Sequence, residues 1–435
     1  MTGAADHVCG GVQVRARDQG GEMEAAGNLK ATVDRIPATE YGDRRERLRA
    51  LAADHGLDGV LVVSRGANGA DWGADVVYLT NHYSAFPQIP DRPGHWSGRG
   101  HSGLVMPVDA DGTLVVEMPD WRRDLVHIDS VRVELDLWAG FADALEDRGL
   151  GSARVGLVGR ESILHIAIDR IRERLPELTF AWADDLIEGM RRIKSEAEIR
   201  LMRESTRVGA EMVEAFVEAA VPGATEADCV LAALNRGLPQ GAFPLDIPVA
   251  SGPNVDHFLW DRMPSWDAQR RLERGDMIHP DMYGTVNGYF YDMVRTTVAG
   301  RKVTEAQREV LEASIAVVEH IIEGMRPGVS CGELFDRGAE WLREHGFDVP
   351  GSESTEDVAL LGQSYPSFGH SLGLAWENPS VVPGEEAVLE PRMVMAIEAE
   401  VGRPGAGTGA FEHDVLVTET GAEILTGHAA NVWWD

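Results

Sequence analysis

Short apolar runs alternate with stretches of helical spacing along the first half of the chain, a pattern typical of an α/β domain. Strands are predicted at Gly59–Val63, Val76–Leu79, Leu104–Val108, Thr113–Met118 and Val155–Val158, and helices at Trp138–Leu145 and Ile163–Leu175. Two of the strands flank Asp109-Ala-Asp-Gly112, which is a hairpin signal. We therefore expect an α/β domain over residues 39–185, preceded by a mobile tail of residues 1–38.

The second half opens on a helix with a clear start. Ser195 is an N-cap, and Glu198 three residues later completes a capping box. This helix is expected to run to Ala220 and to end at Pro222-Gly223. A helix over Glu226–Asn235 and strands at Ile247–Ala250, Met277–Thr285 and Tyr289–Val298 are expected to follow.

The same order of elements then recurs. Thr304 with Gln307 caps a helix through Met325, Ser330 with Glu333 caps a helix through Glu344, and strands return at Met393–Val401 and Phe411–Thr418. Two helices followed by strands, twice over, predict a duplicated α+β unit with a pseudo-twofold axis over residues 186–435.

Composition narrows the class of protein. The formal charge of −31 repels nucleic acid and anionic membranes, so neither is an expected partner. The chain has no apolar run near the ~18 residues of a membrane helix, and its first 30 residues lack the features of a secretion signal. Three widely separated cysteines indicate reduced thiols. We expect a cytoplasmic protein.

Two aspartates share one face of a predicted hairpin. Asn287-Gly288 is a strong two-residue turn signal, and that turn pairs Tyr283 with Asp292. Because side chains alternate along a strand, Asp281 lies on the same face as Asp292 and diagonally across from it, about 7–8 Å away at the backbone. Without a cation, one of two such carboxylates tends to stay protonated.

A second hairpin repeats this arrangement with glutamates. If the Gly-rich connection turns near Gly405, Glu398 and Glu412 lie opposite each other on one face. Between the two hairpins lies His370, whose flanking glycines let the backbone approach closely.

Together these residues form an oxygen-rich donor set, made up of Asp281, Asp292, His370, Glu398 and Glu412. Four ionised carboxylates balance two divalent cations, and the donor types suit manganese first, with cobalt, iron or zinc as alternatives. Two metals about 3.5–4 Å apart lower the pKa of a shared water and stabilise a developing oxyanion. The sequence predicts a centre of two divalent metal ions that activates water or polarises a small substrate.

The order and spacing of these residues resemble the pita-bread metallopeptidase family, which includes methionine aminopeptidase, prolidase and aminopeptidase P, with creatinase as a metal-free relative. The matching stretches are Ile193–Ile199, Val249–Asn254, Asp281–Asp292, Phe368–His370, Met395–Glu398 and Glu412–Gly421. The resemblance implies an α+β fold in which a smaller α/β creatinase-type N-terminal domain precedes a pita-bread catalytic domain over residues 186–435. It also implies a homodimer.

The resemblance implies a role for each donor. Asp281 would bind one metal, His370 and Glu398 the other, and Asp292 and Glu412 would bridge the two. His257 follows Ser-Gly-Pro-Asn254 and matches a family histidine that contacts substrate, so it is a catalytic candidate.

The chain departs from the peptidase pattern beside the histidine ligand. The family pattern G-H-G-x-G-x-x-x-H-E-x-P becomes Gly369–Pro379 here, one residue shorter and without a second histidine. Trp376 or Glu377 stands where the proton-handling imidazole is expected. The usual Glu-Pro-Gly is Glu398-Ala-Glu400, and an arginine often found two residues before the last ligand is Ala410.

This segment also resembles the dimethylsulfoniopropionate lyases of the same fold, in which an acidic residue after the histidine ligand can act as a base. Glu377 is therefore a second catalytic candidate, with a raised pKa expected in an apolar pocket beside Trp376.

Three functional hypotheses follow. The first is a metal-dependent hydrolase of small C–N substrates of the Xaa-Pro peptidase type, with His257 or Glu377 managing protons. The second is a metal-dependent lyase, or a hydrolase of a non-peptide substrate. The third is a non-catalytic pita-bread binding module. The first two take a small molecule or a short peptide as substrate.

Overall fold

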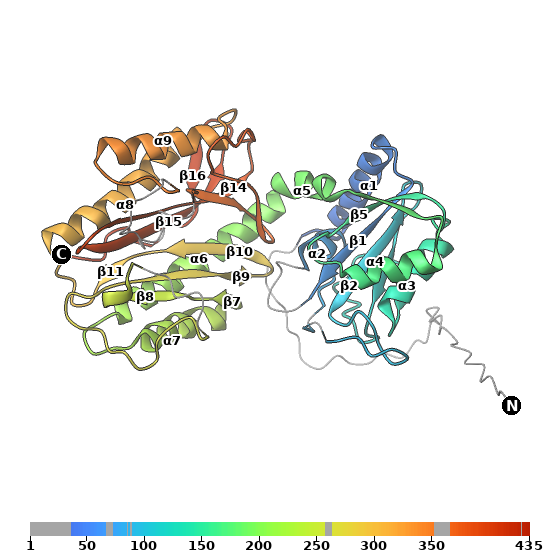
Figure 1. The fold of residues 1–435 in the computed structure, drawn as a ribbon, viewed down its shortest axis with the longest axis horizontal. Coiled ribbons are helices and arrows are strands. Elements are labelled where there is room, and N and C mark those ends of the chain that lie inside the picture. The colour runs from blue at the N-terminus through green and yellow to red at the C-terminus, as the bar shows by residue number, and fades with distance from the viewer. Residues whose placement is uncertain are drawn as a thin grey trace. The chain divides into compact units, whose positions relative to one another are not determined.

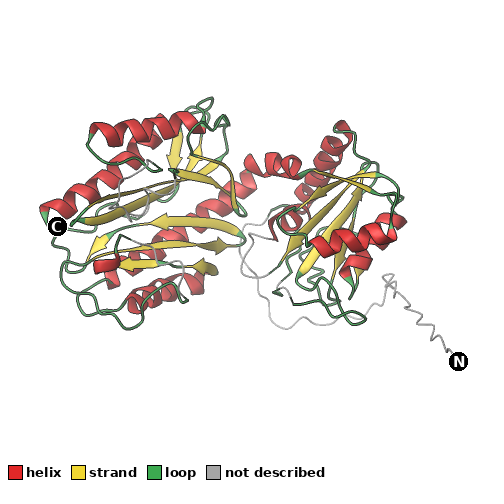
Figure 2. Cartoon of the chain, viewed as in Figure 1, coloured by secondary structure: helices red, strands yellow, loops and turns green. Residues whose placement is uncertain are grey.

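The computed structural model describes residues 36–66, 73–84, 86–87, 89–256, 263–351, 366–427 and 429–435. The chain divides into an N-terminal unit that ends at Ile187 and a C-terminal unit of Glu188–Asp435 (Figure 1). In both units the strands are flanked by helices (Figure 2). Most of the tail expected over residues 1–38 lies outside the described residues, and the first described helix begins at Ala38.

The N-terminal unit is built on one mixed sheet with the strand order β4-β3-β2-β1-β5-β6. Its strands are β1 (Gly59–Arg65), β2 (His101–Pro107), β3 (Thr113–Val116), β4 (Val131–Val133), β5 (Arg154–Val158) and β6 (Thr179–Trp182). Its helices are α1 (Ala38–Asp54), α2 (Ala74–Thr80), α3 (Leu137–Asp147) and α4 (His165–Arg174), and α5 (Asp184–Arg192) runs on into the C-terminal unit. Trp138 and Phe141 of α3 pack on the buried side chains of β1 and β2.

Two expectations for this unit are wrong. The run predicted as a strand at residues 76–79 is helical: Val76, Tyr78 and Leu79 are buried, and the Ser64 hydroxyl accepts a hydrogen bond from the Val76 backbone N–H. A short apolar run does not distinguish a buried strand from a buried helix by periodicity. The helix α1 was not predicted, because it buries two arginines: Arg44 and Arg45 donate hydrogen bonds to the backbone carbonyls of Tyr78 and Leu79.

The C-terminal unit contains two five-stranded sheets. In the first, β9 (Met277–Val286) pairs with β10 (Tyr289–Val294), β11 (Thr297–Val298), β7 (Ala242–Asp246) and β8 (Val249–Ser251). The second has the order β13-β12-β14-β15-β16, with β12 (Gly369–Leu372), β13 (Trp376–Ser380), β14 (Val394–Arg403), β15 (Gly407–Val417) and β16 (Ala422–Ile424). Two short 3-10 helices, η2 (Leu238–Gln240) and η3 (Gly252–Asn254), follow α7 and β8.

A pair of helices packs on each sheet. Residues of α6 (Glu196–Ala219) and α7 (Glu226–Gly237) share a core with β9 and β10, and residues of α8 (Glu305–Gly324) and α9 (Cys331–Glu344) share one with β14 and β15. The predicted capping boxes at Ser195, Thr304 and Ser330 all form. The predicted repeat of two helices and a β-sheet, twice over, is therefore confirmed. None of the helices in the described part of the chain has the length and apolar character that crossing a membrane requires.

The two sheets meet along β10 and β15. An isolated antiparallel bridge joins Arg295 to Phe411, and the Asp414 carboxylate accepts a hydrogen bond of 3.2 Å from the Asp292 backbone N–H. The acidic faces of the two hairpins are thereby brought together.

Candidate metal centre

The first hairpin has the register that its turn predicts. Asn287 and Gly288 have φ values of 56° and 86°, the left-handed pair that a type I′ turn requires. Tyr283 lies opposite Asp292, and Asp281 lies opposite Val294. Asp281 and Asp292 are consequently diagonal neighbours on one face of the hairpin.

The second hairpin also has its predicted register. Its connection turns at residues 404–406, where Gly405 has a φ of 81°. Glu398 on β14 lies directly opposite Glu412 on β15. The strand β12 pairs with the other edge of β14 and brings in His370, opposite Ala396.

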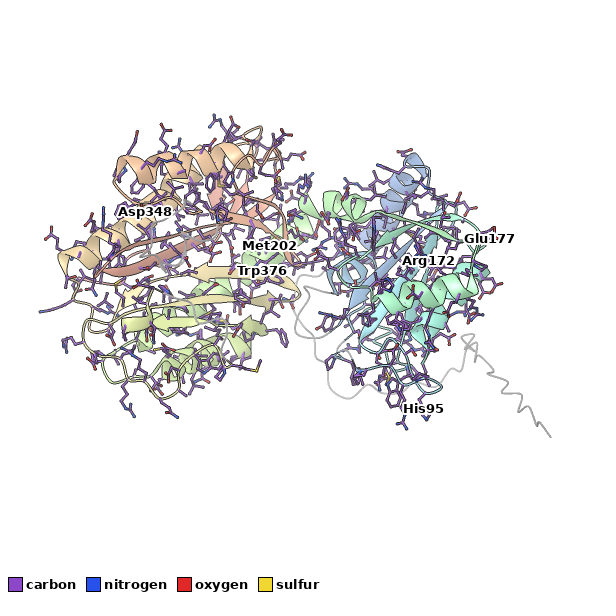
Figure 3. All side chains as sticks on the ribbon, viewed as in Figure 1. His95, Arg172, Glu177, Met202, Asp348 and Trp376 are labelled. Atoms are coloured by element: carbon purple, nitrogen blue, oxygen red, sulfur yellow. The ribbon has the colours of Figure 1, made fainter. Side chains whose placement is uncertain are left out.

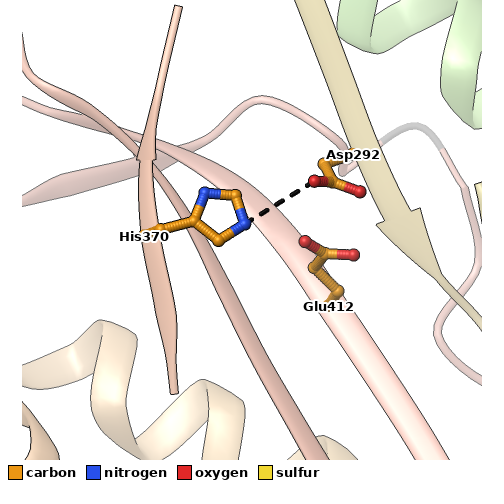
Figure 4. A group of neighbouring side chains, drawn as sticks. All are labelled: Asp292, His370 and Glu412. Carbon is orange, nitrogen blue, oxygen red and sulfur yellow. Dashed lines mark ion pairs between the residues drawn. The ribbon is translucent and has the colours of Figure 1, made fainter. Parts of the chain in front are cut away.

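Three of the predicted donors form a compact group. Ligand atoms of Asp292, His370 and Glu412 all lie within 4.8 Å of one another, and His370 Nε2 is 3.7 Å from Asp292 Oδ2 (Figure 4). His370 Nδ1 lies 3.1 Å from the backbone carbonyl oxygen of Ser371. Because a carbonyl only accepts, Nδ1 donates this hydrogen bond, and Nε2 is the ring nitrogen that faces the carboxylates.

The carboxylates of the site perturb one another's pKa values. Burial raises the pKa of Asp292 to about 7, although a positive charge on His370 and the Trp376 hydrogen bond act in the opposite direction. Burial and then the charges of Asp292 and Glu398 hold the pKa values of Asp281 and Glu412 well above their ordinary range. Burial also raises the pKa of Glu398, although a positive charge on His370 acts to lower it. Asp281 and Glu398 therefore belong to the same electrostatic neighbourhood as the compact group.

This donor set fits divalent cations. Glu412 is only 1% exposed, yet its Oε2 atom has no hydrogen-bond partner. Among the described residues, no lysine or arginine forms an ion pair with any of the four donor carboxylates. A buried carboxylate oxygen without a partner is costly unless a cation approaches it. Four carboxylates and one imidazole are oxygen and nitrogen donors of the kind that divalent metals accept.

The expected raised pKa of Glu377 is wrong. Its Oε1 lies 2.8 Å from Arg191 Nη2, and its Oε2 lies 2.9 Å from Lys194 Nζ. Burial acts to raise the pKa of this carboxyl, but the charges and hydrogen bonds of Lys194 and Arg191 outweigh burial, so the pKa is lowered. An apolar pocket was expected around Glu377, whereas two cations reach it from the segment that precedes α6, more than 180 positions away.

Trp376, not Glu377, lies beside the donor cluster. Its Nε1 donates a hydrogen bond of 2.7 Å to Asp292 Oδ2, and its ring centroid is 6.2 Å from that of His370 (Figure 3 labels Trp376). Successive side chains of a strand point to opposite faces, which separates Trp376 from Glu377. His257, the other catalytic candidate, lies outside the described residues.

Two acidic neighbours of the cluster were not predicted. Asp414 follows Glu412 by two residues and accepts the backbone N–H of Asp292. Glu400 follows Glu398 by two residues, and its charge contributes to the raised pKa of Asp281. The two-residue spacing on a strand, which places both residues of each pair on one face, was the available signal.

The duplicated sheets and the acidic centre between them define a metal-dependent enzyme class with the pita-bread fold. The chain belongs to the metallopeptidase family M24, which its residues 200–419 match, and residues 44–193 match the creatinase/prolidase N-terminal domain. The predicted family, fold class and metallohydrolase class are thereby confirmed.

Relatives cover both units. A Xaa-Pro dipeptidase from Pyrococcus furiosus is 29% identical over 266 residues, which is 60% of this chain and 70% of that one. A creatinase from a Bacillus species is 25% identical over 412 residues, covering 89% of this chain and 90% of that one. The crystal structure of the prolidase from Pyrococcus horikoshii OT3 has a TM-score of 0.71 at 22% identity, covering 88% of this chain and 98% of that one, and it shares the fold.

Proposed function

We propose that this chain is a dinuclear-metal-dependent hydrolase of small C–N substrates, similar to the Xaa-Pro peptidases. One observation carries the proposal. Buried carboxylates from two hairpins converge on one imidazole with raised pKa values, and among the described residues no lysine or arginine pairs with them. The similarity to a protein named Xaa-Pro dipeptidase supports the peptidase-like reaction.

Each donor has a role in this proposal. Asp281 would hold one metal, His370 and Glu398 would hold the other, and Asp292 and Glu412 would contact both. When bound, the metals supply Lewis acidity, which lowers the pKa of a water and stabilises negative charge on a carbonyl oxygen. The bond from His370 Nδ1 to the Ser371 carbonyl fixes the imidazole so that Nε2 remains the donor atom. Manganese as the metal and a cytoplasmic location are further parts of the proposal that rest on the sequence, and a homodimer is a part that rests on the family resemblance.

The handling of protons is assigned to His257 as a sequence-based prediction. Glu377 has no such role in the proposal, because a carboxylate held by two cations, with a lowered pKa, is a weak base. The lyase hypothesis depended on Glu377 as its base, so it loses its main support.

A second candidate, hydrolysis of a non-peptide C–N bond, is favoured by a specific observation. The relative named creatinase matches 89% of this chain, and a relative named probable dipeptidase PepE matches the same share, so this likeness admits a non-peptide substrate without favouring it over a peptide. The observation that favours it is Trp376, which stands near the metal donors in a segment where the peptidase pattern has its second histidine. Both candidates need the same metal centre and differ in the group that flanks the scissile bond.

The test combines metal content with a substrate screen. Metal-free protein is loaded with Mn²⁺ and assayed on Xaa-Pro dipeptides, on non-peptide amides and amidines of similar size, and on dimethylsulfoniopropionate. The Glu412→Gln variant, which keeps the side-chain size, is expected to lose bound metal and C–N hydrolysis together. Glu423→Gln is the matched control, because Glu423 is 44% exposed at its side chain and pairs with Arg203 on the surface.

The outcomes separate the hypotheses. Hydrolysis of Xaa-Pro dipeptides supports the first candidate, and hydrolysis confined to non-peptide compounds supports the second. A wild-type protein that binds no divalent cation contradicts the proposal and favours a non-catalytic module. Cleavage of dimethylsulfoniopropionate alone would support the lyase hypothesis and contradict the proposal of a hydrolase.

A further inference from the structure

The indole of Trp376 makes a short polar contact with a donor carboxylate. Trp376 Nε1 lies 2.7 Å from Asp292 Oδ2, within the range of a hydrogen bond from N–H to an ionised oxygen. Asp292 is only 4% exposed, so few other donors reach this oxygen. Trp376 itself is 43% exposed. Burial of its surface is therefore not the only contact that positions the indole.

Packing holds the indole in this orientation. Its ring centroid lies 4.7 Å from that of Tyr283 and 5.9 Å from that of the fully buried Phe290. The Phe290 backbone N–H donates to the Gly373 carbonyl at 2.9 Å, which ties β10 to the turn that precedes Trp376. On the other face of β13, Glu377 is fixed by Arg191 and Lys194. Aromatic contacts and ion pairs thus hold the strand on both sides.

We propose that Trp376 is a positioning residue that holds the Asp292 carboxylate in the orientation required to contact both metals. This inference rests on the proposed metal centre. The indole N–H donates one hydrogen bond to Oδ2, and an ionised carboxylate has further acceptor sites that metal ions would use. Hydrogen bonds from outside the ligand set orient ligating groups and contribute to metal affinity.

An indole fills this role differently from an imidazole. The indole nitrogen is only a donor, whereas an imidazole both donates and accepts a proton. At this place the chain therefore orients a metal ligand without adding a proton-transfer group. Proton transfer must be carried out by a group elsewhere in the site.

The experiment compares variants that remove or keep the N–H. Trp376→Phe keeps an aromatic ring and removes the donor, and Trp376→His restores an N–H. Trp433→Phe is the matched control, because the Trp433 indole donates to the Ala430 carbonyl at 2.8 Å, a contact that involves none of the five donors. Affinity for Zn²⁺ and Mn²⁺ is measured by calorimetry on metal-free protein, and thermal unfolding checks that each variant is folded.

We expect Trp376→Phe to weaken metal binding about 10–100-fold, the usual effect of losing an outer hydrogen bond to a ligand. Trp376→His is expected to recover most of this loss, and Trp433→Phe is expected to bind metal as the wild type does. Equal affinity in Trp376→Phe and the wild type overturns the inference while leaving the metal centre intact. A loss that Trp376→His does not recover also overturns it, since ring packing would then be the cause. Absence of metal binding in the wild type overturns the proposed function itself.

A spectroscopic measurement reports on the contact directly. In protein labelled with ¹⁵N-tryptophan, the Trp376 indole N–H resonance is assigned by its loss in Trp376→Phe. We expect this resonance to move during titration with diamagnetic Zn²⁺, in parallel with binding, while the Trp433 resonance stays in place. A Trp376 resonance that does not respond to bound Zn²⁺ overturns the inference.

Discussion

Replacing Glu377 with glutamine removes the negative partner of two buried cations while keeping the size of the side chain. The side chains of Glu377, Lys194 and Arg191 are 8%, 1% and 11% exposed. Their contacts of 2.8 and 2.9 Å leave little room for water. Removing one partner of a buried ion pair costs about 3–5 kcal/mol of the free energy of unfolding, because it leaves an uncompensated buried charge.

This free energy converts into a measurable melting temperature. For a cooperative unit of roughly 250 residues, 1 kcal/mol corresponds to about 2 °C, so Glu377→Gln is expected to lower Tm by about 6–10 °C at pH 7. Glu423→Gln makes the same chemical change in an exposed pair, where both side chains are 44% exposed. Exposed pairs contribute less than about 1 kcal/mol, so the control is expected to lose no more than about 2 °C.

The same variant has a defined pH dependence. The pKa of Glu377 in the folded protein is lowered from its ordinary value of 4.5. A carboxyl group whose pKa is lower in the folded protein than in the unfolded chain stabilises the fold. This stabilisation is complete above the pKa of the unfolded chain and is lost as the pH falls through the pKa of the folded protein. The difference in Tm between the wild type and Glu377→Gln should therefore stay constant from pH 7 to about 5.5 and shrink at pH values below about 4.5.

Differential scanning calorimetry over this pH range, together with C–N hydrolysis assays below the transition, tests the reasoning. A Glu377→Gln protein that melts within about 2 °C of the wild type at pH 7 would refute the buried ion-pair account. A variant that keeps its stability but loses all activity would restore Glu377 as the catalytic base.

Three further predictions test the centre and its surroundings. Removing metal with a chelator should lower Tm, and Mn²⁺ restored to ~100 times its Kd should return about 2.7 kcal/mol of stability; an unchanged Tm in calorimetry would contradict a metal centre. Gly373→Ala should cost about 1–3 kcal/mol in urea unfolding, because its Cβ would lie 2.6 Å from Glu377 Oε1. In the control Gly421→Ala the new Cβ meets nothing nearer than 4.0 Å, and an equal loss there would exclude this steric cause. His257→Ala should lower kcat/KM on the identified substrate by about 100-fold or more, as loss of a proton-handling group does, with unchanged metal content; wild-type kinetics would remove His257 from the mechanism.

The parts of the site that were predicted depend on interactions between residues close together in the sequence. The Asn287-Gly288 turn sets the register of its hairpin, and alternation along the strands then places Asp281 beside Asp292 and Glu398 opposite Glu412. The capping residues likewise determined where α6, α8 and α9 begin. In each case the interacting groups are close in sequence, so the chain itself contains the geometric information.

Tertiary structure decided which neighbour of His370 enters the site. Trp376 and Glu377 are adjacent in the sequence, and their types alone favoured the carboxylate as the functional group. In the structure, Glu377 forms ion pairs with two cations from the segment before α6. The Trp376 indole N–H donates a hydrogen bond to an Asp292 oxygen. The pKa of a buried group depends on charges within a few ångströms. Those charges come from residues more than 180 positions away in the chain, and only folding brings them to Glu377.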